Sequence, residues 1–549
     1  MVASDQSGES TCIAFRGETF GPAVTRSATD TPTTAAPQAL SDLCAIALRP
    51  ARLGQLDGIF SLACANANRT VLFTDPSSLV PLYWAWQAGG AAKTSFDPAQ
   101  LAQSATVGPR IARAGLHEFL RLLDIAAPST FFEGVRAVEP GRPLVLGPDG
   151  CSQPDSDALG PSAATAATFD EAVAVLDALL RQVVAQRLVG SVSPAAFLSG
   201  GIDSALVCAI AAQQVPQITA FTVGFDGAGF DESPVAARMA DHLRIRHHVL
   251  RFSRKDYLGA FDRLALGMDQ PMADPATMAT LLAFEHCRDR VDVVLDGTGA
   301  DEAVGAMPPR HVRLAVEFAS RLPAGLRRAA IRAMGHLPGL AGYTPIFDFE
   351  HPAETLMRWK GFTRPEIEAL CGEPVNLEDT TFYRTFARFP RNAHYERYSA
   401  LLNAMPCDRL AQAMRLSGLR VRYPFCARDV DGFLRQLPTE WRHLPGQPKR
   451  ILRELLARYI PVEIWDRPKQ GFNFPLHDFL AGDDYALVRR HVLEGRWLER
   501  RLLRPEVVRR YALQYIAGNR TLMFRVWALA VLGAWLDAHE DVDMPPARA

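Results

Sequence analysis

The sequence predicts an α/β protein in two parts, and three features of the chain indicate this. Short β-like runs dominate before residue 147, a stretch rich in Gly, Pro, Ser, Ala and Thr covers 147–168, and apolar runs alternate with helical segments after it. Alternating strands and helices predict a parallel sheet with helices on both faces. The composition of the middle stretch is typical of a linker. We therefore expect one domain at residues 1–150, a linker at 151–168 and a second domain at 169–549.

The first part contains four short runs that we expect to form strands. They are Cys44–Leu48, Gly58–Ala63, Thr70–Phe73 and Arg142–Leu146.

In the second part the expected elements follow one another in a regular alternation. They are a strand at Ala195, the helix Ala205–Gln214, the strand Ile218–Phe225, the helix Asp231–Leu243, the strand His247–Phe252, a helix around Pro275–Arg288 and the strand Val291–Leu295. Beyond residue 310 the pattern is mostly helical. Ligands of such sheets bind at the carboxyl ends of the strands, where Ser199 and Gly297 both fall.

Bulk composition describes an ordinary globular protein and excludes several classes. The 549 residues are 48% hydrophobic and 22% charged with a net charge of -1, so nothing points to a nucleic acid or a membrane surface as partner. The nine cysteines include no Cys-x-x-Cys pair, which favours reduced thiols in the cytoplasm. No signal peptide is indicated. The apolar run Val526–Leu536 is shorter than the roughly 20 residues that span a bilayer, so we expect a buried C-terminal helix.

The most informative motif is Phe-Leu-Ser-Gly-Gly-Ile-Asp-Ser at 197–204, where a strand ends and a helix begins. The glycines allow positive φ, and consecutive N–H groups at a helix N-terminus form an anion site. The hydroxyl groups add donors, and Asp203 offers a hard oxygen ligand for Mg²⁺. The motif resembles the PP-loop of ATP pyrophosphatases, which cleave ATP between its α- and β-phosphates. The resemblance implies that ATP is held by Ser199, Gly200, Gly201, Asp203 and Ser204.

A second motif, Asp-Gly-Thr-Gly-Ala-Asp-Glu at 296–302, closes the fourth strand of the series. Gly297 permits a close approach to the nucleotide, and Asp301 can supply a second oxygen ligand to the metal. Asp203 and Asp301 are therefore our candidate Mg²⁺ ligands.

Together these motifs resemble the asparagine synthetases and their relatives, the β-lactam synthetases and the lasso-peptide macrolactam cyclases. The likeness extends to the second-strand adenine site, the segment Asp-Gln-Pro-Met-Ala-Asp-Pro-Ala from Asp269, the stretch from Gly418 with Arg420 where Glu is usual, Lys449-Arg450, and Arg-Pro-Lys-Gln-Gly-Phe from Arg467. It implies that Val223 contacts adenine and that Lys449 reaches the phosphates.

The same resemblance assigns the candidate catalytic residues. Lys469, at the position of the family's loop lysine, would stabilise the charge that develops during amide formation; the alternative is a surface lysine. Asp408 lies where β-lactam synthetases carry the Glu of a Tyr–Glu dyad, and Thr298 where they carry the Tyr. Thr cannot relay a proton as a phenol does, which counts against β-lactam synthesis. Asp408 is either a general base or one half of a structural ion pair.

The N-terminal part resembles the glutaminase half of asparagine synthetases, which implies an Ntn-type sandwich. That glutaminase needs a cysteine with a free α-amine, but residue 2 is Val and Cys12 is internal. The domain is therefore expected to have lost its glutaminase activity.

An amine carried by the substrate would replace ammonia, because holding amine and carboxyl together supplies a large effective molarity. We expect a lasso-peptide cyclase, active in antibiotic peptide biosynthesis, that uses ATP and Mg²⁺ to join an acidic side chain of a precursor peptide to its N-terminal amine. A leader peptidase and a leader-binding protein are its expected partners. The alternatives are a β-lactam synthetase-like or ammonia-dependent asparagine synthetase-like amidoligase, and a protein that binds ATP without turnover.

Overall fold

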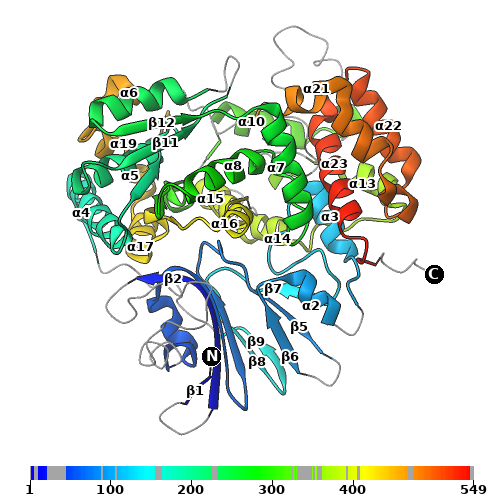
Figure 1. Cartoon of the computed structure of the whole chain (residues 1–549), viewed down its shortest axis with the longest axis horizontal. Coiled ribbons are helices and arrows are strands. Elements are labelled where there is room, and N and C mark those ends of the chain that lie inside the picture. The colour runs from blue at the N-terminus through cyan, green and yellow to red at the C-terminus, as the bar shows by residue number, and fades with distance from the viewer. Residues whose placement is uncertain are drawn as a thin grey trace.

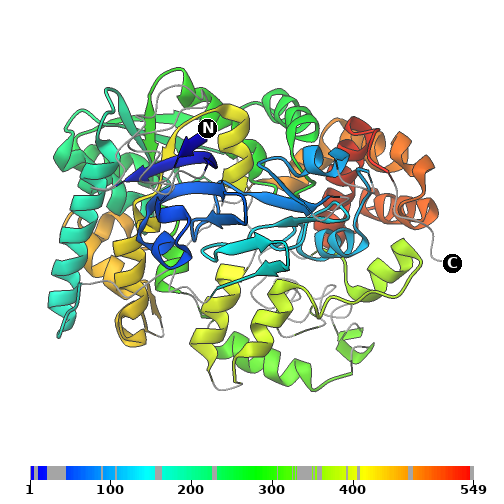
Figure 2. The ribbon, with the colours of Figure 1, turned by 90° about the horizontal axis from the view of Figure 1, so that it is seen from below.

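The computed structural model describes most of the chain, and Figures 1 and 2 show it in two views. The described residues are 2–4, 10–20, 45–87, 91–104, 108–154, 164–225, 231–305, 307–308, 310–323, 325–327, 329–330, 349, 351, 353–354, 361–390, 393–404, 409–444, 446–467 and 474–543.

The N-terminal region is a sandwich of two antiparallel sheets. The first has the order β1-β2-β3-β4-β8-β9 and the second β6-β5-β7. Ala63, Leu72 and Leu146 of the first sheet share a buried cluster with Trp84 of the second sheet and with Val138, which directly follows that sheet's strand β7. The two sheets therefore pack face to face. The strands are β1 (Val2–Ser4), β2 (Ser10–Phe20), β3 (Asp57–Ala65), β4 (Thr70–Thr74), β5 (Tyr83–Trp86), β6 (Ala92–Ser95), β7 (Val135–Ala137), β8 (Leu144–Gly147) and β9 (Gly150–Ser152), accompanied by α2 (Pro98–Ser104) and α3 (Arg113–Leu122).

The expected strand Cys44–Leu48 is wrong. Cys44 lies outside the described residues, and residues 45–47 form a helical turn that runs into the 3-10 helix η1 (Pro50–Gln55). Ala47 and Leu53 are buried against Phe60 and Phe73 on the outer face of the first sheet. A run of five apolar residues is too short for its periodicity to separate helix from strand.

The C-terminal region contains the expected parallel sheet, with the order β12-β11-β10-β13-β14. All four pairings are parallel, and Ala195 lies opposite both Thr219 and Val294, so β10 is the central strand. Carboxyl ends of parallel strands share an edge, which brings the segments after β10, β11 and β13 together. The strands are β10 (Pro194–Phe197), β11 (Thr219–Val223), β12 (Arg246–Leu250), β13 (Val293–Leu295) and the unpredicted β14 (Val421–Arg422).

Helices cover both faces of this sheet, as expected. Successive residues of β10 point to opposite faces: Ala196 belongs to the cluster with α4, α5, α17 and α19, and Ala195 to the cluster with α8 and α16. Helix α4 starts with a capping box between Thr168 and Glu171. These helices are α4 (Phe169–Leu188), α5 (Ile202–Gln214), α6 (Ser233–Leu243), α8 (Thr277–Arg288), α9 (Ala300–Val304), α16 (Arg409–Ser417), α17 (Arg428–Gln436), α18 (Thr439–Arg442), α19 (Arg450–Ala457) and α20 (Val462–Trp465), with η4 (Pro424–Cys426) and the hairpin β15 (His443–Leu444) and β16 (Gln447–Pro448).

Of the expected linker, the first two residues belong to β9, residues 155–163 lie outside the described residues, and Thr168 is the α4 cap.

The remaining helices pack beside the sheet, and the C-terminal ones from α21 to α23 lie on the right in Figure 1. They are α7 (Arg254–Gly267), α10 (Arg310–Ser320), α13 (Arg364–Cys371), α14 (Thr381–Arg388), α15 (His394–Ala404), α21 (Leu476–Val488), η5 (Arg489–Leu493), η6 (Arg496–Arg500), α22 (Pro505–Ile516), η7 (Arg520–Leu522) and α23 (Met523–Ala538). By length and composition Arg520–Ala538 could cross a membrane, and 72% of that stretch is buried within the fold. Trp527 and Trp535 donate hydrogen bonds to the carbonyl groups of Ala273 and Met268, at 2.8 and 2.9 Å.

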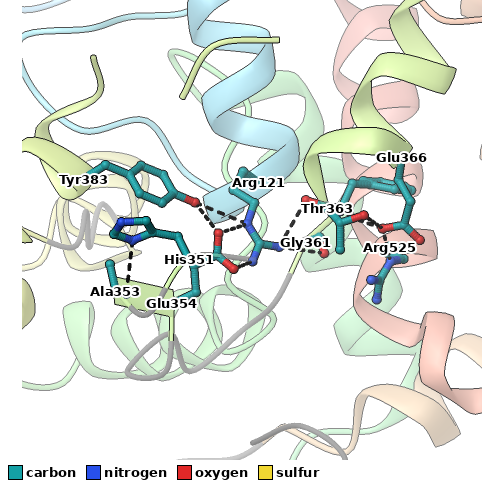
Figure 3. A network of polar contacts seen from close by, with 10 residues as sticks. Arg121, His351, Ala353, Glu354, Gly361, Thr363, Glu366, Tyr383 and Arg525 are labelled. Atoms are coloured by element: carbon teal, nitrogen blue, oxygen red, sulfur yellow. Dashed lines mark hydrogen bonds and ion pairs between the residues drawn. The ribbon is translucent and has the colours of Figure 1, made fainter. Parts of the chain in front are cut away.

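Helix α3 connects the N-terminal sandwich to these helices. Arg113 and His117 contact Glu373 at 2.5 and 3.2 Å, and Arg121 is paired with Glu354 (Figure 3). The three α3 residues are spaced four apart, which places them on one face of the helix. These contacts hold α3, and the start of the segment that follows it, against the C-terminal region.

Glu118, on the same helix, makes stability depend on pH. Burial raises the pKa of Glu118 from its ordinary value of 4.5 to about 7, although the N–H of Ala126 at 3.1 Å opposes the shift. The folded state binds this proton more tightly than the unfolded chain does, so the stabilisation is complete below pH 4.5 and is lost as the pH rises through 7.

We expect Glu118→Gln to remove this dependence, because the amide oxygen still accepts the hydrogen bond and the side chain no longer ionises. The variant should be more stable than the parent at pH 8, by on the order of 3 kcal/mol at most. Chemical denaturation at pH 5 and pH 8 measures the effect, with the exposed Glu463→Gln as control. An unchanged pH slope in Glu118→Gln would contradict the assignment.

Candidate functional site

The loop Ser199–Ser204 follows the central strand and is held in shape by its own hydroxyl groups. Ser204 Oγ accepts from the N–H of Ser199 at 3.0 Å and donates to the Gly201 carbonyl at 3.2 Å. Ser199 Oγ accepts from the N–H of Gly201 at 3.3 Å and lies 2.9 Å from Ser204 Oγ. Gly200 has a φ of +75°, which favours glycine. Helix α5 begins directly after Gly201, so a preformed anion site lies at its N-terminus.

The second motif packs directly against this loop. A Cβ on Gly297 would lie 2.6 Å from the backbone nitrogen of Ser204, so only glycine fits there. The backbone N–H and the hydroxyl of Thr298 both donate to Asp296 Oδ1, at 2.8 and 2.5 Å. The Thr298 hydroxyl is thus engaged within its own turn.

The two candidate metal carboxylates are brought together, and Lys449 lies between them. Lys449 Nζ is 2.5 Å from Asp203 Oδ2 and 2.8 Å from Asp301 Oδ1. Burial disfavours the charged ammonium, but the two carboxylates outweigh it and raise the pKa of Lys449. Lys449 is the residue before α19, with a left-handed φ of 56°. Its positive charge therefore offsets the negative charges of both carboxylates.

Asp203 and Asp301 fit a Mg²⁺ ion that arrives with a nucleotide. Magnesium is usually bound by one or two carboxylates plus substrate phosphates, and it retains waters. Among the described residues no group of three or more His, Cys, Asp or Glu side chains could hold a metal by itself. Two carboxylates beside a phosphate-binding loop match a Mg²⁺ site that is completed by substrate phosphates, and not a site formed by protein ligands alone.

A cavity of about 640 Å³ joins these elements and lies between the N- and C-terminal regions. Six predicted site residues line it: Ser199, Asp203, Ser204, Val223, Gly297 and Asp301. Its walls also include residues 76–79 and 122–127 of the N-terminal region. Volumes of about 300–1,000 Å³ are typical of ligand sites.

The other predicted site residues are not among the described residues that line the cavity. Gly200 and Gly201 shape the loop, and Lys449 contacts the carboxylates. Lys469 and Asp408 lie outside the described residues, so their roles stay predictions.

Sequence reasoning did not single out several residues that line the cavity. Glu302 follows Asp301 and is partly buried; this burial first, and repulsion from Asp301 second, raise the pKa of Glu302. Asp274 and Arg409 line another part of the wall. Glu302 and Asp274 stand in motifs quoted above, but only the fold shows that they face the cavity.

The described cysteines of the N-terminal region are Cys12, Cys64 and Cys151, and each lies inside a strand. Cys12 is paired in register with both Val2 and Ala65. None of the three carries a free α-amine.

Comparison with known proteins matches both regions. Residues 175–537 match the asparagine synthase family, and residues 43–155 match a glutamine amidotransferase domain. A putative glutamine-hydrolysing asparagine synthetase of Mycobacterium tuberculosis is 28% identical over 88% of this chain and 77% of its own length. Asparagine synthetase 1 of Bacillus subtilis is 24% identical over the same shares. Among solved structures, an ammonia-dependent NAD synthetase from Campylobacter jejuni covers 25% of this chain and 61% of its own, at 16% identity and a TM-score of 0.20.

The family match covers more than half of the chain and includes the loop, the second motif and Lys449. The chain belongs to the asparagine synthase family and is an ATP-dependent ligase that forms C–N bonds and releases AMP.

Proposed function

We propose that this ligase closes a macrolactam in a ribosomally made precursor peptide, joining an Asp or Glu side chain to the N-terminal amine. The observation that carries the proposal is the position of Cys12, in the middle of a strand ladder and without an α-amine. A glutaminase of this type needs a terminal cysteine, and its absence removes the internal source of ammonia. An amine belonging to the substrate is then the simplest nucleophile.

The cavity supports a substrate larger than a single amino acid. Its walls come from the nucleotide loops, from residues 402–404 and 409–410, and from residues 122–127 of the N-terminal region. A peptide held there would have its carboxylate and amine in one enclosure, and this arrangement replaces a bimolecular encounter by an intramolecular step.

In the proposed reaction, the loop Ser199–Ser204 holds the phosphates of ATP, and Val223 lies beside the adenine. A side-chain carboxylate oxygen attacks the α-phosphorus, the bond to the β-phosphate oxygen breaks, and pyrophosphate leaves. The substrate amine then attacks the acyl carbon, loses a proton and displaces AMP. Lys469 would stabilise the oxyanion and Asp408 would accept the proton. Mg²⁺, held by Asp203 and Asp301 together with the phosphates, would neutralise the charge on the leaving pyrophosphate.

A second candidate is an ammonia-dependent asparagine synthetase. The two curated relatives described above are named as asparagine synthetases, which favours this reaction, but both names specify glutamine as the nitrogen source. A β-lactam synthetase-like reaction has less support, because the Thr298 hydroxyl is bound to Asp296 and cannot serve as a phenolic proton relay. The location that we propose is the cytoplasm, with a leader peptidase and a leader-binding protein supplying the peptide and with no nucleic-acid or membrane partner.

The test is incubation with ATP, Mg²⁺ and a synthetic leader-free candidate core peptide that has a free N-terminal amine and an Asp or Glu side chain. Peptide-dependent pyrophosphate release together with the loss of one water from the peptide supports the cyclase. Turnover of aspartate and ammonia, with none of the peptide, would falsify it.

Glutamine is expected to be inert as a nitrogen donor. Cys12→Ala should leave peptide-dependent pyrophosphate release within about twofold, because the thiol has no role in the proposed chemistry and Cys12 is exposed, on the strand β2. Glutamate release from glutamine, measured by a coupled assay, should be at background in both proteins. Glutaminase activity that Cys12→Ala removes would contradict the proposal.

A further inference from the structure

Asp274 and Arg409 form a charged pair on the wall of the cavity. Arg409 Nη1 lies 3.6 Å from Asp274 Oδ2, and the two side chains are 18% and 17% exposed, respectively. Both residues line the cavity that contains the nucleotide loops. This separation is longer than a hydrogen bond, so the contact is an ion pair without a direct hydrogen bond between these two atoms.

The segment that carries Asp274 is firmly held. The N–H of Ala273 donates to the Leu123 carbonyl at 2.7 Å, and the Ala273 carbonyl accepts from Trp527. Asp274 Oδ1 accepts from the N–H of Ala276 at 2.8 Å, which leaves Oδ2 as the atom directed toward Arg409. A carboxylate fixed in this way is preorganised for a ligand, because little side-chain entropy remains to be lost on binding.

A neighbouring pair between the same two elements provides an internal comparison. Asp269 and Arg415 also join this segment to α16, but they are 2.9 Å apart, Asp269 is 5% exposed, and neither lines the cavity. Arg415 donates further to the Gly267 carbonyl and to Gln412. That pair is closed and structural, whereas the Asp274–Arg409 pair faces the space where the substrate would lie.

The reaction requires an amine next to an activated carboxyl, and an α-amine reaches the enzyme largely as ammonium at neutral pH. A fixed, largely buried carboxylate binds an ammonium through charge-assisted hydrogen bonds. A guanidinium beside this carboxylate can donate hydrogen bonds to the substrate oxygen nearest the amine. That oxygen belongs to the first peptide carbonyl in a peptide and to the α-carboxylate in a free amino acid.

We propose that Asp274, with Arg409 beside it, binds the α-ammonium group of the substrate. The inference rests on the proposed function, because it requires a substrate with an α-amine in this cavity. In a macrolactam substrate that group is the nucleophile, and its binding precedes the proton loss that frees the nitrogen lone pair. In a free amino acid it is a recognition group only.

The test is equilibrium binding by calorimetry to the full chain with Mg²⁺ and α,β-methylene-ATP, which is not cleaved between the α- and β-phosphates. Two probe pairs differ only in the amine: the core peptide against its des-amino form, and aspartate against succinate. In at least one of the two pairs, the parent protein should bind the probe with the amine about 10- to 100-fold more tightly than the probe without it. Asp274→Asn should reduce that preference to about twofold or less, because the amide keeps the hydrogen bond from Ala276 but lacks the charge.

Asp269→Asn is the matched control and should keep the full preference. If Asp274→Asn keeps it as well, or if the parent protein shows no preference in either pair, the inference is overturned. A preference confined to the peptide pair supports both the inference and the cyclase. A preference confined to aspartate supports the ammonium site and overturns the proposed function.

Discussion

Asp203→Asn is expected to reduce ATP-dependent pyrophosphate release by at least about 10²- to 10³-fold. Asp203 is the acidic residue in the first turn of α5, and it faces the cavity beside Ser199 and Ser204. The substitution keeps the shape of the side chain and removes the charge that would hold a cation on the phosphates. In the parent protein Lys449 contacts both Asp203 and Asp301, and in the variant only the carboxylate of Asp301 remains beside it.

The fold should survive the substitution, since the Asp203 side chain is 23% exposed and the loop is held by its serine hydroxyl groups. Pyrophosphate release and circular dichroism, measured together, separate loss of activity from loss of structure. The exposed Asp262→Asn serves as control and should behave as the parent. Turnover of Asp203→Asn within twofold of the parent would rule out the metal role.

Arg121→Met is expected to produce the largest loss of stability. The guanidinium is 1% exposed and donates to Glu354, 2% exposed, and to the carbonyl of Phe362 at 3.1 Å (Figure 3). The hydroxyl of Tyr383 also donates to Glu354, at 2.5 Å. Without the guanidinium, the buried Glu354 carboxylate loses its positive partner and keeps, within this network, the neutral Tyr383 hydroxyl. Breaking a buried ion pair by removing one partner costs about 3–5 kcal/mol.

The double variant Arg121→Met/Glu354→Met separates this effect from the loss of packing. Because it removes both charges, it should be more stable than Arg121→Met alone, by about 1–3 kcal/mol. Chemical denaturation of the parent, the two single variants and the double variant gives the coupling energy. A double variant as unstable as the sum of the singles would show that the charges do not act as a pair.

Arg121→Met should also lower ligase activity, since α3 leads directly into the cavity wall at 122–127. Core-peptide binding should weaken more than ATP binding, because residues 122–127 line the cavity but are not part of the two nucleotide loops.

The local geometry of the candidate nucleotide site was predictable from the sequence. The loop Ser199–Ser204 is one strand-to-helix connection, and its glycines and hydroxyl groups specify their own geometry. The second motif was placed beside it because parallel strands end at one edge of a sheet. The same reasoning found the order of strands and helices but not β14, which is two residues long.

Contacts between distant segments were not predictable in this way. Lys449 is separated from Asp203 by 246 positions, and Arg121 from Glu354 by 233. The sequence resemblance assigned Lys449 to the phosphates, but only the fold shows its ammonium between the two carboxylates. Likewise, nothing local distinguishes Asp274, which lines the cavity, from Asp269 five residues before it, which is closed in a buried ion pair.

The most direct test of the central proposal follows the oxygen atoms of the substrate. A core peptide whose reacting side-chain carboxylate carries oxygen-18 is incubated with the enzyme, ATP and Mg²⁺. If this carboxyl is adenylated and then captured by the amine of the same peptide, one labelled oxygen appears in AMP for each macrolactam formed. The other labelled oxygen stays in the new amide. Macrolactam without label in AMP, or labelled AMP that forms only when ammonia is added, would contradict the account.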